Sequence, residues 1–184
     1  MKIVVSPNPY RDKQFKHARQ ACQILKEAGA EVSLCLPFDV DRSFEIPSDL
    51  RFREIQKEIR TADMLICFGG DGTILHVAVT LRDHPIPIIG VNFGGKGFLA
   101  GLEDDELDIL LEIADGKYTI SRRMMLDVEL VRNERIICTQ SVLNDVVIHG
   151  GHVDCIGVTA YGDGVPITRF NGDGIIVATP TGST

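Results

Sequence analysis

The sequence lacks an excess of positive charge. Its 184 residues carry 19 Lys and Arg against 26 Asp and Glu, which gives a formal net charge of −7. This charge disfavours a broad electrostatic footprint for nucleic acid or for an anionic membrane surface. Any polyanionic ligand must therefore be bound by a local site, so we expect small molecules as partners, with no nucleic acid and no membrane.

Apolar runs of membrane-spanning length are also missing, and Met1 to Val5 lead directly into a strand pattern without a signal peptide. Secretion and membrane insertion are therefore disfavoured. The five cysteines are odd in number, scattered, and include no Cys-x-x-Cys pair. We expect reduced thiols in the core of a cytoplasmic protein. The hydrophobic content of 44% is enough for one large domain or two small ones.

Strand and helix patterns alternate over the first half of the chain. The strand patterns cover 3–7, 32–36, 64–68 and 86–92, and the helix patterns cover 16–28, 50–59 and 73–79. This alternation predicts an α/β domain in which helices cover both faces of a parallel sheet.

The pattern changes after a short acidic helix that we expect over 107–114. Residues 120–131 and 136–160 are rich in β-branched side chains, which predicts strands. We therefore expect two domains, an α/β domain over 1–101 and a β-rich domain over 102–184.

The chain is organised around Gly69-Gly70-Asp71-Gly72-Thr73, where a buried strand pattern turns into a helix pattern. Such corners are ligand sites in open α/β sheets. Glycine lets backbone N–H groups approach a ligand closely, and phosphate oxygens bind near the start of a helix. Two interpretations of Asp71 stay open from the residues alone: a Mg²⁺ ligand or proton acceptor, and a helix N-cap.

Other polar stretches allow two interpretations as well. Asn144-Asp145 lies inside an apolar run, so it is either a turn or a ligand contact, with the turn favoured. The Gly-Asp-Gly at 162–164 predicts a hairpin turn. The Gly-Asp-Gly at 172–174 precedes a strand pattern and the small residues 179–184, which suit a ligand contact or a loop. We expect His76 to be a core or interface residue, and we assign no metal site to the protein side chains.

Taken together, three motifs resemble the bacterial NAD kinase family in their letters, order and separation. They are Gly69-Gly70-Asp71-Gly72-Thr73, Asn144-Asp145-Val146-Val147, and Gly172-Asp173-Gly174 followed by Ala178-Thr179-Pro180-Thr181-Gly182-Ser183-Thr184. The first motif alone is shared with diacylglycerol and sphingosine kinases, whereas the third is more discriminating.

The resemblance implies a Rossmann-like first domain, a β-sandwich-like second domain and an active site in the cleft between them. It implies transfer of a phosphoryl group from ATP or polyphosphate to the 2′-hydroxyl of the adenosine ribose of NAD, which gives NADP. Mg²⁺ or another divalent cation is implied as a cofactor, and a homo-oligomer as the assembly.

The resemblance also implies residue roles. Asp71 is the implied proton acceptor, and Gly69, Gly70, Gly72 and Thr73 form the implied nucleotide-binding segment around it. Asn144 and Asp145 are implied to hold NAD through ribose hydroxyls and neighbouring groups. Asp173 is implied to contact the far end of the substrate, and Thr184 to begin a segment around the adenine.

The resemblance spans essentially all 184 residues but covers only the front part of a family member. We therefore expect a piece of a longer protein, with an incomplete second domain and exposed strand edges. Two alternatives stay open: a lipid kinase of the same superfamily, and a non-catalytic dinucleotide-binding fragment.

Overall fold

The computed structural model describes residues 1–93, 97–151 and 155–183 and divides into two compact units, Met1–Ser121 and Arg122–Thr184. The first unit runs on past Gly101, where the sequence placed the division. The reason is that strand β5 (Leu102–Glu103) pairs with the preceding strand and helix α4 (Leu110–Ala114) packs against the first helix.

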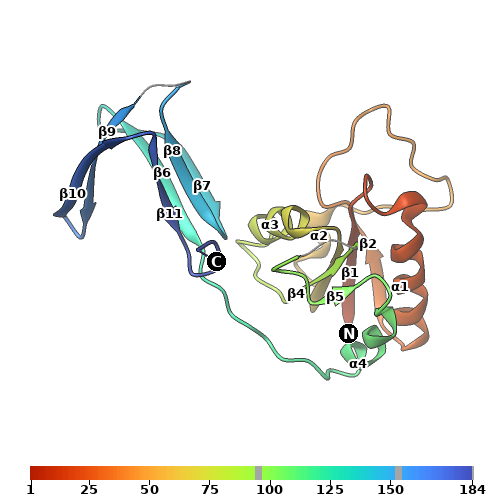
Figure 1. Ribbon diagram of the computed structural model, residues 1–184. Coiled ribbons are helices and arrows are strands. Elements are labelled where there is room, and N and C mark those ends of the chain that lie inside the picture. The colour runs from red at the N-terminus through yellow and green to blue at the C-terminus, as the bar shows by residue number, and fades with distance from the viewer. Residues whose placement is uncertain (94–96, 152–154, 184) are drawn as a thin grey trace. The chain divides into compact units, whose positions relative to one another are not determined.

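A parallel sheet forms the centre of the first unit (Figure 1). In its described part the strands lie in the order β2-β1-β3-β4-β5, with β1 at Lys2–Pro7, β2 at Glu31–Leu34, β3 at Met64–Phe68 and β4 at Ile88–Asn92. The α/β architecture is thus confirmed. Because the strands are parallel, the ends of β1, β3 and β4 meet at one edge, where Phe68 lies between Pro7 and Val91.

Helices cover both faces of this sheet (Figure 1). On one face, α1 (Lys16–Glu27) and α4 pack on Ile3, Val5 and Ile66, with the short 3-10 turns η1 (Lys13–Phe15) and η2 (Leu107–Ile109) beside them. On the other face, α2 (Ile55–Glu58) and α3 (Asp71–Thr80) pack on Val4, Leu65 and Cys67. The alternation of strand side chains between the two cores follows from the period of two in a strand.

The predicted helix over 50–59 is wrong in its first half. Residues 50–53 are not helical, and the Arg53 N–H donates a 2.7 Å hydrogen bond to the Leu34 carbonyl at the outer edge of β2. Pairing with the sheet therefore replaces helix there, and only Ile55–Glu58 is α-helical.

The described residues of the second unit form three antiparallel strand pairs. The pairs are β6 (Leu126–Arg132) with β7 (Arg135–Val142), β8 (Asp145–His149) with β11 (Gly174–Ala178), and β9 (Ile156–Gly162) with β10 (Val165–Gly172). The hairpin predicted at 162–164 is confirmed, with positive φ at Asp163 (50°) and Gly164 (79°). A second sheet-rich unit was thus correctly expected.

All five cysteines lie in described residues and are free thiols. Cys22, Cys35 and Cys67 are buried as expected, but Cys138 and Cys155 are exposed, so the expectation of core thiols is wrong for these two. None of the helices in the described part of the chain is long and apolar enough to cross a membrane.

Candidate functional site

The glycine corner joins β3 to α3 at the carboxyl edge of the sheet. Gly69 has a φ of 154°, and a Cβ there would overlap the Thr73 side chain, so this position accepts only glycine without strain. Gly70 is extended and precedes the helix, which begins at Asp71, two residues earlier than the sequence pattern predicts. The corner therefore presents the first turn of α3 at the edge where the strands end.

Asn8 ties the end of β1 to this corner. Its backbone N–H donates to the Phe68 carbonyl at 2.8 Å, and its side-chain amide donates to the Thr73 hydroxyl at 2.9 Å. Its side-chain oxygen accepts from the Tyr10 N–H at 3.0 Å. These bonds fix the start of α3 against the loop that follows β1.

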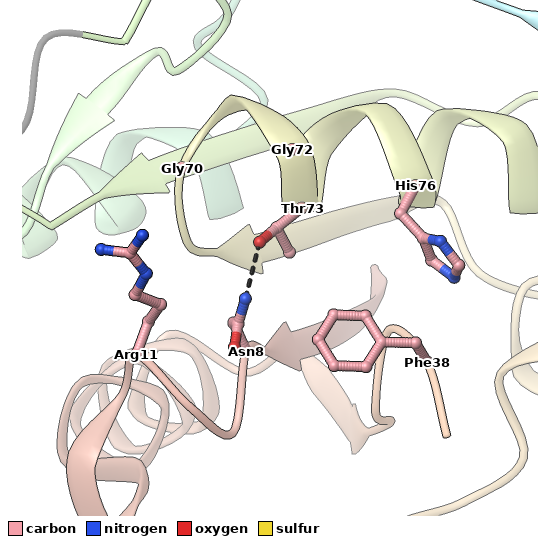
Figure 2. Close-up of a pocket in the computed structure, with 7 residues that line it drawn as sticks. All are labelled: Asn8, Arg11, Phe38, Gly70, Gly72, Thr73 and His76. Atoms are coloured by element: carbon pink, nitrogen blue, oxygen red, sulfur yellow. Dashed lines mark hydrogen bonds between the residues drawn. The ribbon is translucent and has the colours of Figure 1, made fainter. Parts of the chain in front are cut away.

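A pocket of about 300 Å³ opens beside the first turns of α3 (Figure 2). Its walls among the described residues are Asn8, Arg11, Phe38, Gly70, Gly72, Thr73 and His76. Figure 2 shows Arg11 and Asn8 near Gly70 and Thr73, and the rings of Phe38 and His76 together farther along the helix. These two rings meet edge to face, with centroids 5.6 Å apart.

The pocket suits an anionic, partly aromatic ligand. The N-terminus of a helix carries a partial positive charge, and a guanidinium binds phosphate oxygens in a bidentate manner. Arg11, Gly70 and Gly72 place both features at one end of the pocket. A Cβ at either glycine would meet open space, so the approach to their backbone is clear.

Asp71 is half-buried and is not among the described residues that line the pocket. Its two carboxylate oxygens accept hydrogen bonds from the backbone N–H groups of Phe98 (3.0 Å) and Leu99 (3.2 Å). A Cβ at Gly97 would lie 3.1 Å from one of these oxygens, so the close approach of this loop favours glycine. A carboxylate has about four acceptor positions. Asp71 can therefore accept a further hydrogen bond, for example from a hydroxyl group.

The second and third motifs lie together in the second unit. Antiparallel pairing of β8 with β11 places Asp145 opposite Ala178, so Asn144 meets the turn that follows β11. The Thr179 N–H donates to the Asn144 carbonyl at 2.8 Å, and a Cβ at Gly182 would overlap the Asn144 backbone. The Thr179 hydroxyl is buried and donates to the Leu143 carbonyl at 2.6 Å. Asn144 thus lies in a bend immediately before β8, whereas Asp145 is the first residue of that strand, so the turn predicted for the pair is present at Asn144 alone.

The side-chain oxygen of Asn144 is buried and has no hydrogen-bond partner in the described part of the chain. An unpaired buried acceptor is costly. A ligand that donates to this oxygen would remove the cost, so both interpretations of the sequence, a turn and a ligand contact, are compatible with the position.

Asp173 lies at the opposite end of the β8–β11 pair. Its carbonyl accepts from the Gly150 N–H at 3.2 Å, beyond the pairing of Gly174 with His149. The five residues of β11 separate it from the Asn144 turn, which is roughly 17 Å at about 3.4 Å per residue. Thr184 lies outside the described residues.

The predicted residues of each unit are therefore placed as follows. The first unit gathers Gly69, Gly70, Asp71, Gly72 and Thr73 at one corner, with Asp71 turned to a different loop from the pocket. The second unit gathers Asn144 and Asp145, with Asp173 at the far end of the same strand pair.

Sequence reasoning missed Asn8, Arg11 and Phe38. Its expectation of His76 as a core residue is wrong, because His76 is exposed and lines the pocket, whereas an interface role stays a prediction. One signal was available: Asn8 and Arg11 follow a strand that neighbours β3 in a parallel sheet, so they lie at the same edge as the glycine corner.

The chain matches the family model described as the ATP-NAD kinase N-terminal domain over residues 2–118. It is 35% identical to the NAD kinase of Ruminiclostridium cellulolyticum over 185 residues and 33% identical to that of Acetivibrio thermocellus over 189 residues. These alignments cover 100% of this chain and 63% of each relative. The chain thus spans less than two thirds of the length of these curated relatives.

Two solved structures resemble the whole chain. An NAD kinase from Archaeoglobus fulgidus in complex with ATP gives a TM-score of 0.71 at 26% identity, over 100% of this chain and 62% of that one. Yeast NADH kinase complexed with NADH gives a TM-score of 0.76 at 23% identity, over 100% and 59%. At 23% identity, the resemblance to yeast NADH kinase concerns the fold alone.

Proposed function

Because this chain belongs to the NAD kinase family, we propose that the intact protein phosphorylates the 2′-hydroxyl of the adenosine ribose of NAD to give NADP. ATP or polyphosphate is the donor of the phosphoryl group. The observation that carries the proposal is the glycine corner at the carboxyl edge of the sheet, which combines a helix N-terminus, accessible glycine backbone and Arg11 in one pocket.

In this proposal Asp71 is the proton acceptor. The ribose oxygen forms a bond to the transferred phosphorus, the bond from that phosphorus to the donor's bridging oxygen breaks, and the hydroxyl proton passes to the carboxylate. The Phe98 and Leu99 N–H groups hold the carboxylate in one orientation. Phosphoryl transfer requires little covalent chemistry from the protein. Positioning of the two substrates and one carboxylate as general base are therefore sufficient for this reaction.

Gly70, Gly72, Thr73 and Arg11 bind donor phosphates in this proposal, and Gly69 shapes the corner. Asn144 and Asp145 hold NAD, with the unpaired side-chain oxygen of Asn144 as support for a ligand contact there.

Asp173 contacts the far end of NAD in the proposal, and Thr184 begins the segment around its adenine. The separation of Asp173 from Asn144 along the β8–β11 pair suits a ligand as long as a dinucleotide.

The proposed divalent cation fits a chain that contributes few ligands. The described residues contain no group of three or more His, Cys, Asp and Glu side chains that could hold a metal ion. Mg²⁺ in kinases is commonly held by one or two carboxylates together with substrate phosphates, so the donor phosphates would be its main ligands here and Asp71 remains the proton acceptor. When bound, the ion supplies neutralisation of the phosphate charge.

We further propose a homo-oligomer in the cytoplasm. Large apolar side chains such as Ile137, Ile148 and Ile176 are more than half exposed on the second unit. Their exposure favours burial against another subunit. The free cysteines suit a reducing compartment. Light scattering tests the assembly, and a monodisperse monomer of the intact protein contradicts it.

A coupled assay of NADP formation tests the function. ATP and polyphosphate are supplied separately to this chain and to its longer parent protein, with labelled phosphate transfer to diacylglycerol measured in parallel. We expect NADP from the parent with at least one donor and no labelled lipid. Labelled lipid without NADP overturns the proposal in favour of a lipid kinase, and NAD binding without turnover favours a binding module.

A further inference from the structure

A second, larger cavity lies on the outer side of the first unit, away from the glycine corner. It measures about 770 Å³ and lies between α1, the edge strand β2 and residues 49–53. Cys22, Val32, Leu34 and Leu50 give it an apolar lining. We call this cavity the β2-edge groove, and none of the described residues that line it also lines the pocket at the glycine corner.

The groove contains open backbone at the edge of the sheet. In a parallel ladder, alternate residues bond to opposite neighbours. Glu31 and Cys35 donate their N–H groups toward β1, so Val32 and Leu34 turn theirs to the outer edge. The Arg53 N–H is hydrogen-bonded to the Leu34 carbonyl, whereas no backbone group in the described part of the chain pairs with Val32 on that edge. Val32 therefore offers one N–H donor and one C=O acceptor side by side.

Positive charge surrounds the groove in a chain that is acidic overall. Arg19, Lys26, Arg51 and Arg53 line it, against Glu27 and Asp49. Arg19 is paired with Asp49, and Arg53 with Glu58 outside the lining. Lys26 and Arg51 have no ion-pair partner among the described residues. Lys26 and Arg51 are therefore available to bind an anionic group of a ligand.

The apolar wall next to Lys26 is uncharged. Burial raises the pKa of the Cys22 thiol to about 11, although the charge of Lys26 acts in the opposite direction. The thiol is therefore protonated at neutral pH and does not repel an anion. Two acids in the lining oppose an anion: Asp49, which is paired with Arg19, and Glu27, which accepts a hydrogen bond from Gln23 at 2.9 Å.

We propose that the β2-edge groove is a second ligand site, for a mononucleotide whose base pairs with the Val32 backbone and whose phosphate binds Arg51 and Lys26. A planar base needs one donor and one acceptor on adjacent positions, which Val32 provides. An added peptide strand needs several such residues, and Arg53 already occupies the next one. The volume lies within the usual range of about 300–1,000 Å³ for small-molecule sites. This site is independent of the proposed phosphoryl transfer.

Backbone amide NMR on the protein with adenosine monophosphate as the probe tests the proposal. We expect saturable shifts of the Val32, Ser33 and Leu50 amides. Arg51→Gln and Lys26→Gln should each weaken this titration about tenfold, since each removes one charge-assisted hydrogen bond. Arg42→Gln is the matched control, because Arg42 is exposed in the same connector and does not line the groove. Spectra of the free variants verify that they are folded.

Comparison with adenosine and with inorganic phosphate separates the two parts of the ligand. We expect each to titrate the Val32 amide more weakly than adenosine monophosphate. Equal binding of phosphate alone overturns the role of the base, and equal binding of adenosine overturns the role of the cations. Absence of shifts at Val32 at saturating nucleotide, or shifts at Gly70 and Gly72 alone, overturns the site altogether.

Discussion

The side-chain amide of Asn8 donates a 2.9 Å hydrogen bond to the hydroxyl of Thr73, which joins the end of β1 to the first turn of α3. Thr73 is 5% exposed and contributes to the lining of the pocket. This single contact connects two segments 65 residues apart and forms one wall of the pocket at the glycine corner.

We predict that Asn8→Ala and Thr73→Val each lower the free energy of unfolding by about 0.5–1.5 kcal/mol, the usual net contribution of one hydrogen bond. The double variant should lose less than the sum, because both changes remove the same contact. Urea denaturation measures all three, and Thr73→Ser is the control that keeps the hydroxyl. Strictly additive losses would show that the two side chains do not interact.

Alanine substitution should affect the two glycines of the corner in opposite ways. Gly69→Ala places a side chain at positive φ against Thr73, so we expect a loss of about 1–3 kcal/mol in stability. Gly72→Ala meets open space within α3, so we expect no loss, or a gain of up to about 1 kcal/mol. Thermal unfolding measures both, and equal effects would contradict the packing at Gly69.

Stability should fall in acid partly through Glu58. Hydrogen bonds from Lys2, Ser33 and Arg53 to its carboxylate, with that from Lys2 the strongest cause, lower its pKa from 4.5 to about 2. A carboxyl with a lowered pKa in the folded state contributes stability above the unfolded pKa and loses it as pH falls. The loss should lie between pH 4.5 and about 2.

Glu58→Gln and Lys2→Met should both flatten that part of the stability profile, because each removes the contact that shifts the pKa. Urea denaturation at a series of pH values measures the slope. If the pH dependence of stability between pH 4.5 and about 2 is unchanged in both variants, Glu58 is not a cause of the loss of stability in acid.

Asn144 should matter for binding more than for stability. Its side-chain oxygen has no partner in the described residues, so Asn144→Ala removes no hydrogen bond made by that atom and should change stability by less than about 1 kcal/mol. We expect its NAD affinity to fall at least about tenfold. Thr179→Val is the structural control, since it removes the bond to the Leu143 carbonyl and should destabilise by about 1–3 kcal/mol. Calorimetry that finds full NAD affinity in Asn144→Ala would contradict the role of Asn144.

Local patterns were sufficient to predict most of the first unit. The buried run Met64–Phe68 and the glycines after it specify a strand and a sharp corner from local chemistry alone, and both are present. Residues 50–53 begin a segment with apolar helix spacing but are not helical, because the pairing of Arg53 with the edge of β2 is a long-range interaction that the local pattern does not contain.

The pocket was harder to predict than the corner. Asn8, Arg11 and Phe38 come from loops after β1 and β2, and only the order of strands in the sheet brings them to α3. His76 follows apolar neighbours in sequence, yet Ile74, Val77 and Ala78 already form the buried face of the helix, so His76 lies off that face and lines the pocket. Burial on a helix depends on the packed face rather than on adjacent residues.

The most direct test of the account is the turnover of Asp71→Asn in the intact protein, measured as NADP formation. The substitution keeps the size of the side chain and leaves one oxygen to accept from Phe98 or Leu99. We predict a folded protein that binds NAD and forms NADP about 10²–10⁴-fold more slowly, the usual range for loss of general acid–base help. A folded variant with undiminished turnover would contradict the assignment of Asp71 as the proton acceptor.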